Sequence, residues 1–142
     1  MKQALAALAV MAVLAFGALQ APAPALAADK QRVVLQVSDN DPKKWNLALN
    51  NAKNVQQALG KENVDVEIVA YGPGLNMLKA DSKVAPRLAA AMDDGVVLNA
   101  CGNTMRNTKV SESDLAGGVK IVDAGVIHIM QRQREGWAYV KP

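Results

Sequence analysis

The stretch VVLNACGNTM, residues 96–105, decides how this chain folds and which residue is its first candidate for chemistry. It begins as an apolar run that is too short for a helix and is bounded by Gly95 and Gly102, which is typical of a buried strand. The only cysteine of the protein, Cys101, follows that run. Small polar residues come next and can start a helix. A thiol at the end of a strand, facing the amides of a following turn or helix, is in a place that can lower its pKa.

Strand and helix patterns alternate on both sides of this stretch. Apolar or alternating runs predict strands over residues 32–37, 65–71, 96–100, 119–122 and 137–140. Apolar residues at helical spacing predict helices over 42–59, 84–92 and 124–134, with Asp41, Ser82 and Asp123 as their caps. Residues 103–115 are predicted as a long polar connection with short helical turns around Thr104 and over residues 111–115. This order predicts an α/β fold in which helices cover both faces of a mostly parallel sheet of five strands.

The strand over 65–71 also carries an alternating pattern. Asp65, Glu67 and Val69 alternate with more apolar residues, so these three are predicted to lie on a less buried face.

The first 27 residues have the features of a secretory signal peptide. Lys2 gives a short basic start, residues 4–19 are apolar, and residues 25–27 form the small-x-small cleavage signal Ala-Leu-Ala. The apolar segment is short for a membrane span and two prolines follow it, so a cleaved signal is favoured over a retained anchor. The sequence therefore predicts a signal peptide over 1–27, one domain over 28–142 and a periplasmic location.

The rest of the composition argues against two classes of partner. The net charge of +3 is small and the basic residues are scattered, so no nucleic-acid footprint is expected. No segment of residues 28–142 is apolar enough to cross a membrane, so no membrane partner is expected after signal cleavage.

A single cysteine in an exported chain calls for an explanation. Cys101 has no partner for an internal disulfide, and an unpaired thiol persists in an oxidising compartment if it is buried, bonded or useful. It follows a strand, as do residues 38–41, 72–74 and 123–125, and open α/β sheets bind ligands outside the carboxyl ends of their strands. This position favours a functional thiol. A buried cysteine that packs as a small apolar residue is the alternative.

The spacing of residues along the sequence excludes several known kinds of catalytic or binding site. One residue too few separates Cys101 from Arg106 for the loop of a cysteine-dependent phosphatase, and no histidine precedes the cysteine. A thioredoxin motif needs a second cysteine. The sequence has no phosphate-binding loop that ends in Gly-Lys-Ser or Gly-Lys-Thr. Residues 72–74, Gly-Pro-Gly, indicate a tight turn.

Other side chains are weaker candidates. His128, the only histidine, would have to lie beside Cys101 to act as its base; we expect instead a histidine at a helix edge or interface with one hydrogen bond. Cys101, Met105, Met77 and His128 are suitable ligand types for copper(I), although they are scattered along the chain. Arg106 either adds positive charge near the thiol or is a solvated loop residue.

Three segments together resemble one protein family. They are YGPGLNML (71–78), VVLNACGNTMR (96–106) and GGVKIVDAGVIHIMQRQREGWAYVKP (117–142). In combination they are similar to the DsrE/DsrF-like proteins, and most closely to the exported branch that is often described as intracellular sulfur oxidation proteins. The resemblance covers nearly all of residues 28–142.

The resemblance implies a three-layer α/β/α fold with a five-stranded parallel sheet, and assembly into dimers, trimers or hexamers. The best-understood members carry sulfur as a persulfide on a single cysteine within relay complexes, and they use no metal or organic cofactor. For this chain the resemblance places that role on Cys101, with Gly102, Asn103 and Thr104 forming the turn around its sulfur. It implies sulfur donors and acceptors, either proteins or small sulfur compounds, as partners.

Two alternatives stay open beside this interpretation. One is a module that binds a small ligand or copper(I) at the same place. The other is an oligomeric subunit whose Cys101 is inert.

Overall fold

The computed structural model describes residues 30–142, and a sheet of five strands forms its centre. The strands are β1 (Gln31–Val37), β2 (Val64–Ala70), β3 (Val97–Cys101), β4 (Lys120–Val122) and β5 (Ala138–Val140). They lie in the order β4-β3-β2-β1-β5, and every neighbouring pair is parallel. All five carboxyl ends therefore lie at one edge of the sheet, which we call the carboxyl edge. The predicted parallel α/β sheet is confirmed.

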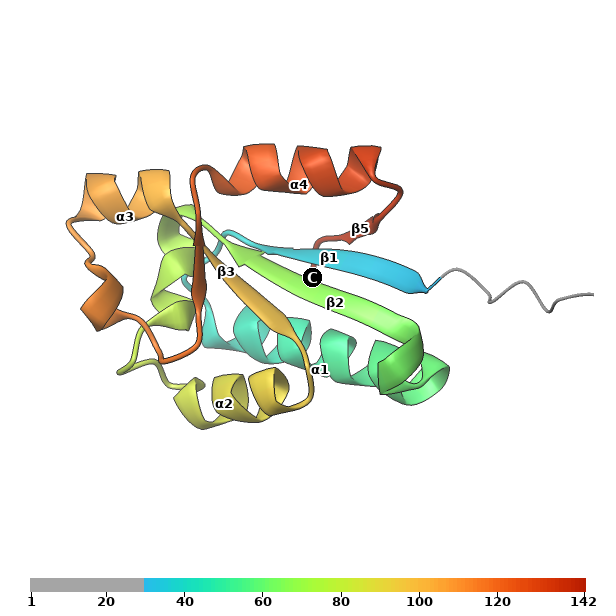
Figure 1. Ribbon diagram of the computed structural model, residues 1–142. Helices are drawn as coiled ribbons and strands as arrows, with labels where there is room; N and C mark the ends of the chain where they lie inside the picture. Colours follow the sequence, from blue (N-terminus) through green and yellow to red (C-terminus); the bar gives the residue numbers. More distant parts are fainter. Residues whose placement is uncertain (1–29) are drawn as a thin grey trace, which may run out of the picture.

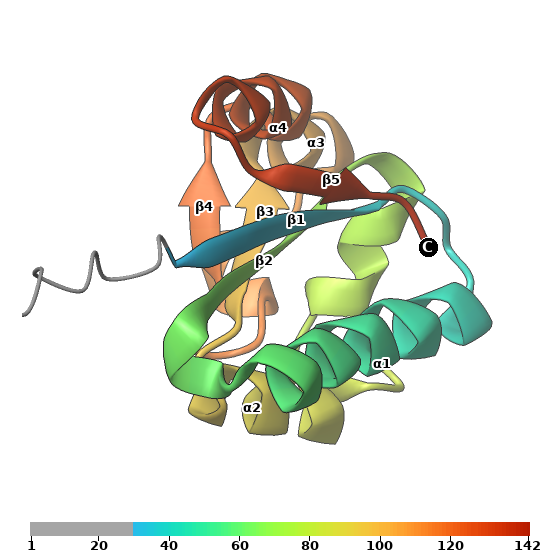
Figure 2. The same ribbon diagram turned by 90° about the vertical axis from the view of Figure 1, so that its right-hand side faces the viewer.

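Helices lie on both faces of this sheet, so the fold has three layers (Figure 1). α1 (Pro42–Leu59) and α2 (Ala85–Asp93) cover one face, and α4 (Gly125–Arg134) covers the other. Figure 2, turned by 90°, shows the sheet between these two layers. The short α3 (Gly102–Thr108) lies on the side of α4, beyond the carboxyl end of β3. Three 3-10 turns, η1 (Lys61–Asn63), η2 (Gly72–Leu78) and η3 (Glu112–Asp114), complete the described elements.

The first helix shows how local sequence sets an element's bounds. The Asp41 carboxylate accepts a hydrogen bond of 2.8 Å from the Lys43 amide and caps the helix, while Pro42 occupies its first position. Gly60 follows the last turn with a φ of 87°, a conformation that favours glycine, and its amide donates to the Gln56 carbonyl at 2.9 Å. The helix predicted over 42–59 is therefore found with the same bounds.

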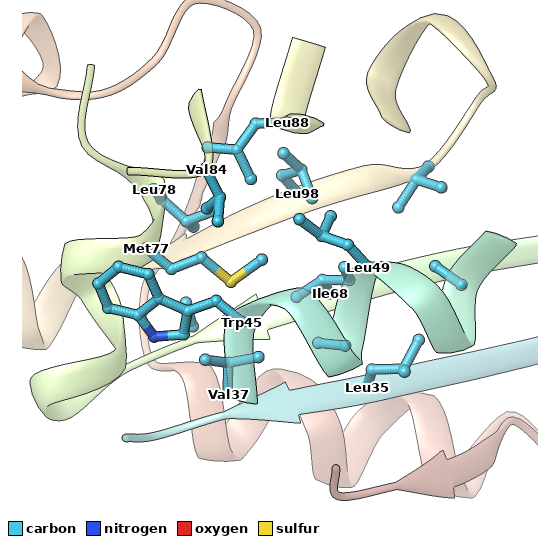
Figure 3. Close-up of a cluster of buried hydrophobic side chains, with 14 of the residues drawn as sticks. Leu35, Val37, Trp45, Leu49, Ile68, Met77, Leu78, Val84, Leu88 and Leu98 are labelled. Carbon is cyan, nitrogen blue, oxygen red and sulfur yellow. The ribbon is translucent and has the colours of Figure 1, made fainter. Parts of the chain in front are cut away.

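The larger apolar core lies between the sheet and the α1–α2 layer (Figure 3). Trp45 and Leu49 of α1 point toward the strands, where they pack with residues such as Ile68, and Met77 of η2 fills the same core. Trp45 is 4% exposed, and its indole N–H donates to the Asp39 carbonyl at 2.7 Å. Each such side chain contributes about 1.5–3 kcal/mol when it is buried.

The core on the opposite face is much smaller. Its buried members are Val34, Val69 and Ile129, with Tyr71 and Trp137 packed against them. The α1–α2 side therefore supplies most of the apolar stabilisation, whereas the α4 side has room for polar groups.

The less buried face predicted for β2 proved wrong. Glu67 is 5% exposed and Val69 is fully buried, because α4 covers this part of the sheet. The alternation was identified correctly, but sequence pattern alone could not show that a helix from the far end of the chain returns to this face.

Two predicted helix caps also need correction. α4 is preceded by Ala124 as its N-cap with no side-chain cap, so Asp123 does not cap it. α2 likewise has Val84 as its N-cap, and the Ser82 hydroxyl accepts from the Val84 amide in the turn before it. The helical turns predicted within the connection of residues 103–115 are found, because α3 spans Gly102–Thr108 and η3 spans Glu112–Asp114.

The signal peptide predicted for residues 1–27 lies outside the described residues. Between residues 30 and 142, no helix is both long and apolar enough to pass through a membrane.

Candidate functional site

Cys101 is the last residue of β3 and directly precedes α3 at the carboxyl edge. Neighbouring side chains of a strand point to opposite faces, so Cys101 shares a face with Asn99. The Asn99 amide donates to the Glu67 carboxylate, which is also bound by His128 of α4. Both side chains therefore lie on the α4 face of the sheet. Cys101 is 5% exposed, so its thiol is buried in this chain.

Hydrogen-bond donors surround the sulfur and favour its ionised form. Burial raises the pKa of Cys101, but the Thr104 hydroxyl and the amides of Gly125, Thr104 and Asn103 outweigh it and lower the pKa below its usual 9.0. The Gly125 amide donates to Sγ at 3.2 Å. Because these donors bind a charged sulfur more strongly than a neutral one, the site favours the nucleophilic thiolate.

The predicted loop residues form the first turn of α3, and Thr104 has the most direct role. Its Oγ1 accepts a hydrogen bond of 2.9 Å from the Gly72 amide. A hydroxyl has one proton to donate, and because Gly72 is the donor in this bond, that proton stays available for the sulfur, whose pKa the hydroxyl lowers. The Asn103 amide donates to the Asp123 carbonyl at 3.1 Å, and of these donors it lowers the pKa of Cys101 least. A Cβ at Gly102 would lie 3.1 Å from the Val122 carbonyl oxygen, so α3 starts tightly against β4.

Sequence reasoning placed Gly125 at a strand end but gave it no role beside the sulfur; it is the first residue of α4. A Cβ at this position would lie 3.2 Å from Cβ of Tyr71 and 3.3 Å from Cβ of Cys101. The absence of a side chain therefore lets the start of α4 approach the sulfur closely. A strand-to-helix transition with glycine at the first helical position was the available signal, since strand ends were already identified as the place for ligands.

Tyr71 is a second residue that sequence reasoning did not assign to the site. It follows β2, packs beside Gly125, and has a raised pKa because of burial, followed by the nearby Tyr139, Asp39 and Cys101. Its phenol therefore stays neutral and adds no negative charge next to the thiolate.

The four residues considered for copper(I) are not brought together. Met77 and Met105 belong to the apolar core on the α1–α2 side, whereas Cys101 faces α4. His128 Nε2 is 2.7 Å from Glu67 Oε2, which is the single hydrogen bond expected for it. Among residues 30–142, no group of three or more histidine, cysteine or acidic side chains has the arrangement of a metal site.

Arg106 lies on α3 and binds the side chain of Asn103. It is exposed and sits one turn from the thiol, so it is a solvated surface residue beside the site.

A polar cluster lies behind the thiol, between the sheet and α4. Glu67 of β2 accepts from Asn99 at 3.2 Å, from Nε of Arg132 at 3.2 Å and from Nη2 of Arg132 at 2.8 Å, and it binds His128. Arg132 also binds Glu135 and lies over the Trp137 ring at 4.9 Å. Sequence reasoning named His128 but not its partners, because the pairing joins residues that are far apart along the chain.

A hollow of about 340 Å³ opens between η2 and α3. Its lining includes Gly72, Asn76, Lys79, Thr104 and Asn107. Thr104 lines this hollow and also lowers the pKa of Cys101, whereas Cys101 itself does not line the hollow.

The family model described as the DsrE/DsrF-like family matches residues 31–142. The chain belongs to the DsrE/DsrF-like family. This match confirms the predicted family. The family is associated with sulfur relay, which supports the predicted theme of sulfur metabolism. None of the curated proteins matches the chain.

Solved structures share the fold of this chain. A protein of unknown function from Methanobacterium thermoautotrophicum is 38% identical, with a TM-score of 0.76; the match covers 79% of this chain and 99% of that one. A protein of unknown function from Bacteroides thetaiotaomicron is 17% identical (TM-score 0.64; 83% and 99% covered). The ychN protein from E. coli is 12% identical (TM-score 0.66; 80% and 99% covered). The last two matches support the fold alone.

Proposed function

We propose that this protein is an exported sulfur carrier that holds sulfane sulfur as a persulfide on Cys101. The observation that carries the proposal is the set of donors around one sulfur: a hydroxyl and amides from the starts of two helices, which lower the pKa of the thiol. A thiolate is the form of cysteine that attacks sulfur. Membership of a family associated with sulfur relay supports this choice of substrate.

The proposed exchange has two balanced steps. The Cys101 thiolate attacks the terminal sulfur of a donor persulfide, a new S–S bond forms, and the donor thiolate leaves with the electron pair of the broken S–S bond. An acceptor thiolate then attacks the terminal sulfur on Cys101, and the Cys101 thiolate leaves. The same donors stabilise Cys101 as nucleophile in the first step and as leaving group in the second. The exchange needs thiols and sulfane sulfur, with no metal or organic cofactor.

Mass spectrometry tests the proposal directly. The native protein is exposed to polysulfide and examined without reductant. The proposal expects a mass gain of about 32 Da, one sulfur atom, that is lost on treatment with a thiol and is absent from Cys101→Ser. Failure to gain sulfur, or an adduct that remains in Cys101→Ser, contradicts it.

The burial of Cys101 favours one competing function, an oligomeric subunit with an inert thiol. Alkylation separates the two. A carrier reacts in the native state at a rate that rises with pH through the thiol pKa, whereas an inert thiol reacts only after unfolding. If the edge instead binds a small ligand, the unfolding temperature should rise with the logarithm of the ligand concentration once the site is saturated.

Partners and location are part of the same proposal. Donor and acceptor are proteins or small sulfur compounds, and the signal peptide of residues 1–27 delivers the chain to the periplasm. A second copy of the chain covers the outer side of α4, where Val126, Ile127 and Met130 are about half exposed. Sedimentation of the mature protein tests the assembly. The Ile127→Asp variant should dissociate into monomers. A wild type that is already monomeric, or a variant that stays assembled, contradicts this interface.

A further inference from the structure

The Glu67 cluster joins three elements, and two of them, β3 and α4, carry Cys101 and Gly125. Glu67 belongs to β2, Asn99 lies on β3 in the same strand as Cys101, and His128 and Arg132 lie on α4. Glu67 is 5% exposed, and a buried carboxylate is costly unless its oxygens are bound. Here Oε2 receives three of the contacts and Oε1 the fourth.

The cluster fixes the position of α4 along the sheet. His128 and Arg132 follow Gly125 by about one and two helical turns, so both lie on the stripe of α4 that faces the sheet. The His128 amide donates to the Ala124 carbonyl at 2.9 Å, which closes the first turn of the helix. The apolar contact beneath α4 contributes only one well-buried helix residue, Ile129. Polar contacts with Glu67 therefore carry much of the docking of this helix.

We propose that Glu67, His128 and Arg132 are positioning residues for the thiol: they hold α4 so that the Gly125 amide points at the Cys101 sulfur. The distance from the Gly125 nitrogen to Sγ is 3.2 Å, and a hydrogen bond weakens steeply when its geometry is disturbed. A small retreat of α4 removes this donor. The inference concerns the ionisation of the thiol and is independent of the proposed transfer of sulfur.

A direct charge effect of Glu67 on the thiol would have the opposite sign. A negative carboxylate disfavours a nearby thiolate, so neutralising it by Glu67→Gln would by itself favour the thiolate. It would also leave the positive charge of Arg132 less compensated, which again favours the thiolate. If the cluster positions α4, the same substitution disfavours the thiolate. The sign of the change therefore distinguishes positioning from electrostatics.

The experiment measures the rate of alkylation of Cys101 by iodoacetamide as a function of pH. For Glu67→Gln we expect the pH–rate profile to move to higher pH and the rate at neutral pH to fall about tenfold, as for the loss of one charge-assisted hydrogen bond. The matched control is Glu135→Gln, which removes the exposed carboxylate that also binds Arg132. It should leave the profile unchanged.

Two further variants keep the test decisive. If Glu67→Gln does not fold, Arg132→Lys keeps the charge at a side chain that is 28% exposed but loses the paired contact, and it should move the profile in the same direction. In Gly125→Ala, where the donor is already displaced, adding Glu67→Gln should change the profile little. A profile that stays in place or moves to lower pH in the folded variants overturns the inference, even where their unfolding midpoints fall.

Discussion

Replacing Thr104 by valine tests the hydroxyl that contributes most to lowering the pKa of Cys101. Valine has nearly the same shape as threonine, so the first turn of α3 should keep its packing. What is lost is the donor to the sulfur and the acceptor for the Gly72 amide, a bond of 2.9 Å. The substitution therefore isolates one hydrogen bond to the thiolate and one to the backbone.

The expected magnitudes follow from these two bonds. A hydrogen bond to a charged group is worth about 1.5 kcal/mol or more, so the thiolate population at neutral pH should fall about tenfold. Leaving the Gly72 amide without its partner at a partly buried position should lower the free energy of unfolding by about 1 kcal/mol. Both effects should appear in the same variant.

Alkylation kinetics and urea unfolding measure the two effects separately. Thr104→Val should shift the pH–rate profile of Cys101 to higher pH, whereas Thr104→Ser, which keeps the hydroxyl, should leave it near that of the wild type. Thr108→Val is the matched control, because the Thr108 hydroxyl donates to the Thr104 carbonyl at 2.7 Å on the exposed side of α3. Equal profiles for Thr104→Val and the wild type would refute the role assigned to this hydroxyl.

Three more predictions concern the same molecule. Gly125→Ala should push the start of α4 away, since its Cβ would lie 3.2 Å from Tyr71, and native alkylation of Cys101 at neutral pH should slow by severalfold; an unchanged rate contradicts the role of this amide. Because folding lowers the pKa of the Cys101 thiol, the wild type should gain stability over Cys101→Ser as pH rises from the folded pKa toward 9.0, and lose that gain at lower pH. Denaturant titrations at several pH values measure this difference, and a trend of the opposite sign would show that the fold destabilises the thiolate. Asp41→Ala should cost about 1 kcal/mol in unfolding free energy without changing alkylation, and no loss in urea unfolding would mean that the bond to Lys43 caps nothing.

Local signals predicted the main elements well. The helix α1 was found with the predicted bounds because its cap, its apolar stripe and its terminal glycine all lie within one segment. Each of the five strands was predicted to within one or two residues, since apolar runs between turn residues are also local features. Cys101 was placed at the carboxyl end of β3 for the same reason.

The remaining parts of the site depend on contacts between distant segments. Gly125 and Tyr71 meet Cys101 only because the order of strands brings the starts of α4 and η2 to the end of β3. Glu67 looked like a residue of an exposed face because its partners, His128 and Arg132, lie more than half the described chain away. Pattern reasoning identifies which residues lie on one face of an element, but not which other element covers that face.

The order of the elements along the chain has a consequence for when the thiol becomes acidic. Cys101 and most of the larger core precede α4, so a chain that has folded only as far as β3 already contains the cysteine but not the Gly125 amide. At that stage Cys101 has neither the Gly125 amide nor the Glu67 cluster that holds it. The pKa of the thiol is therefore fully lowered only when the last segment docks, and a growing or truncated chain contains a less acidic cysteine.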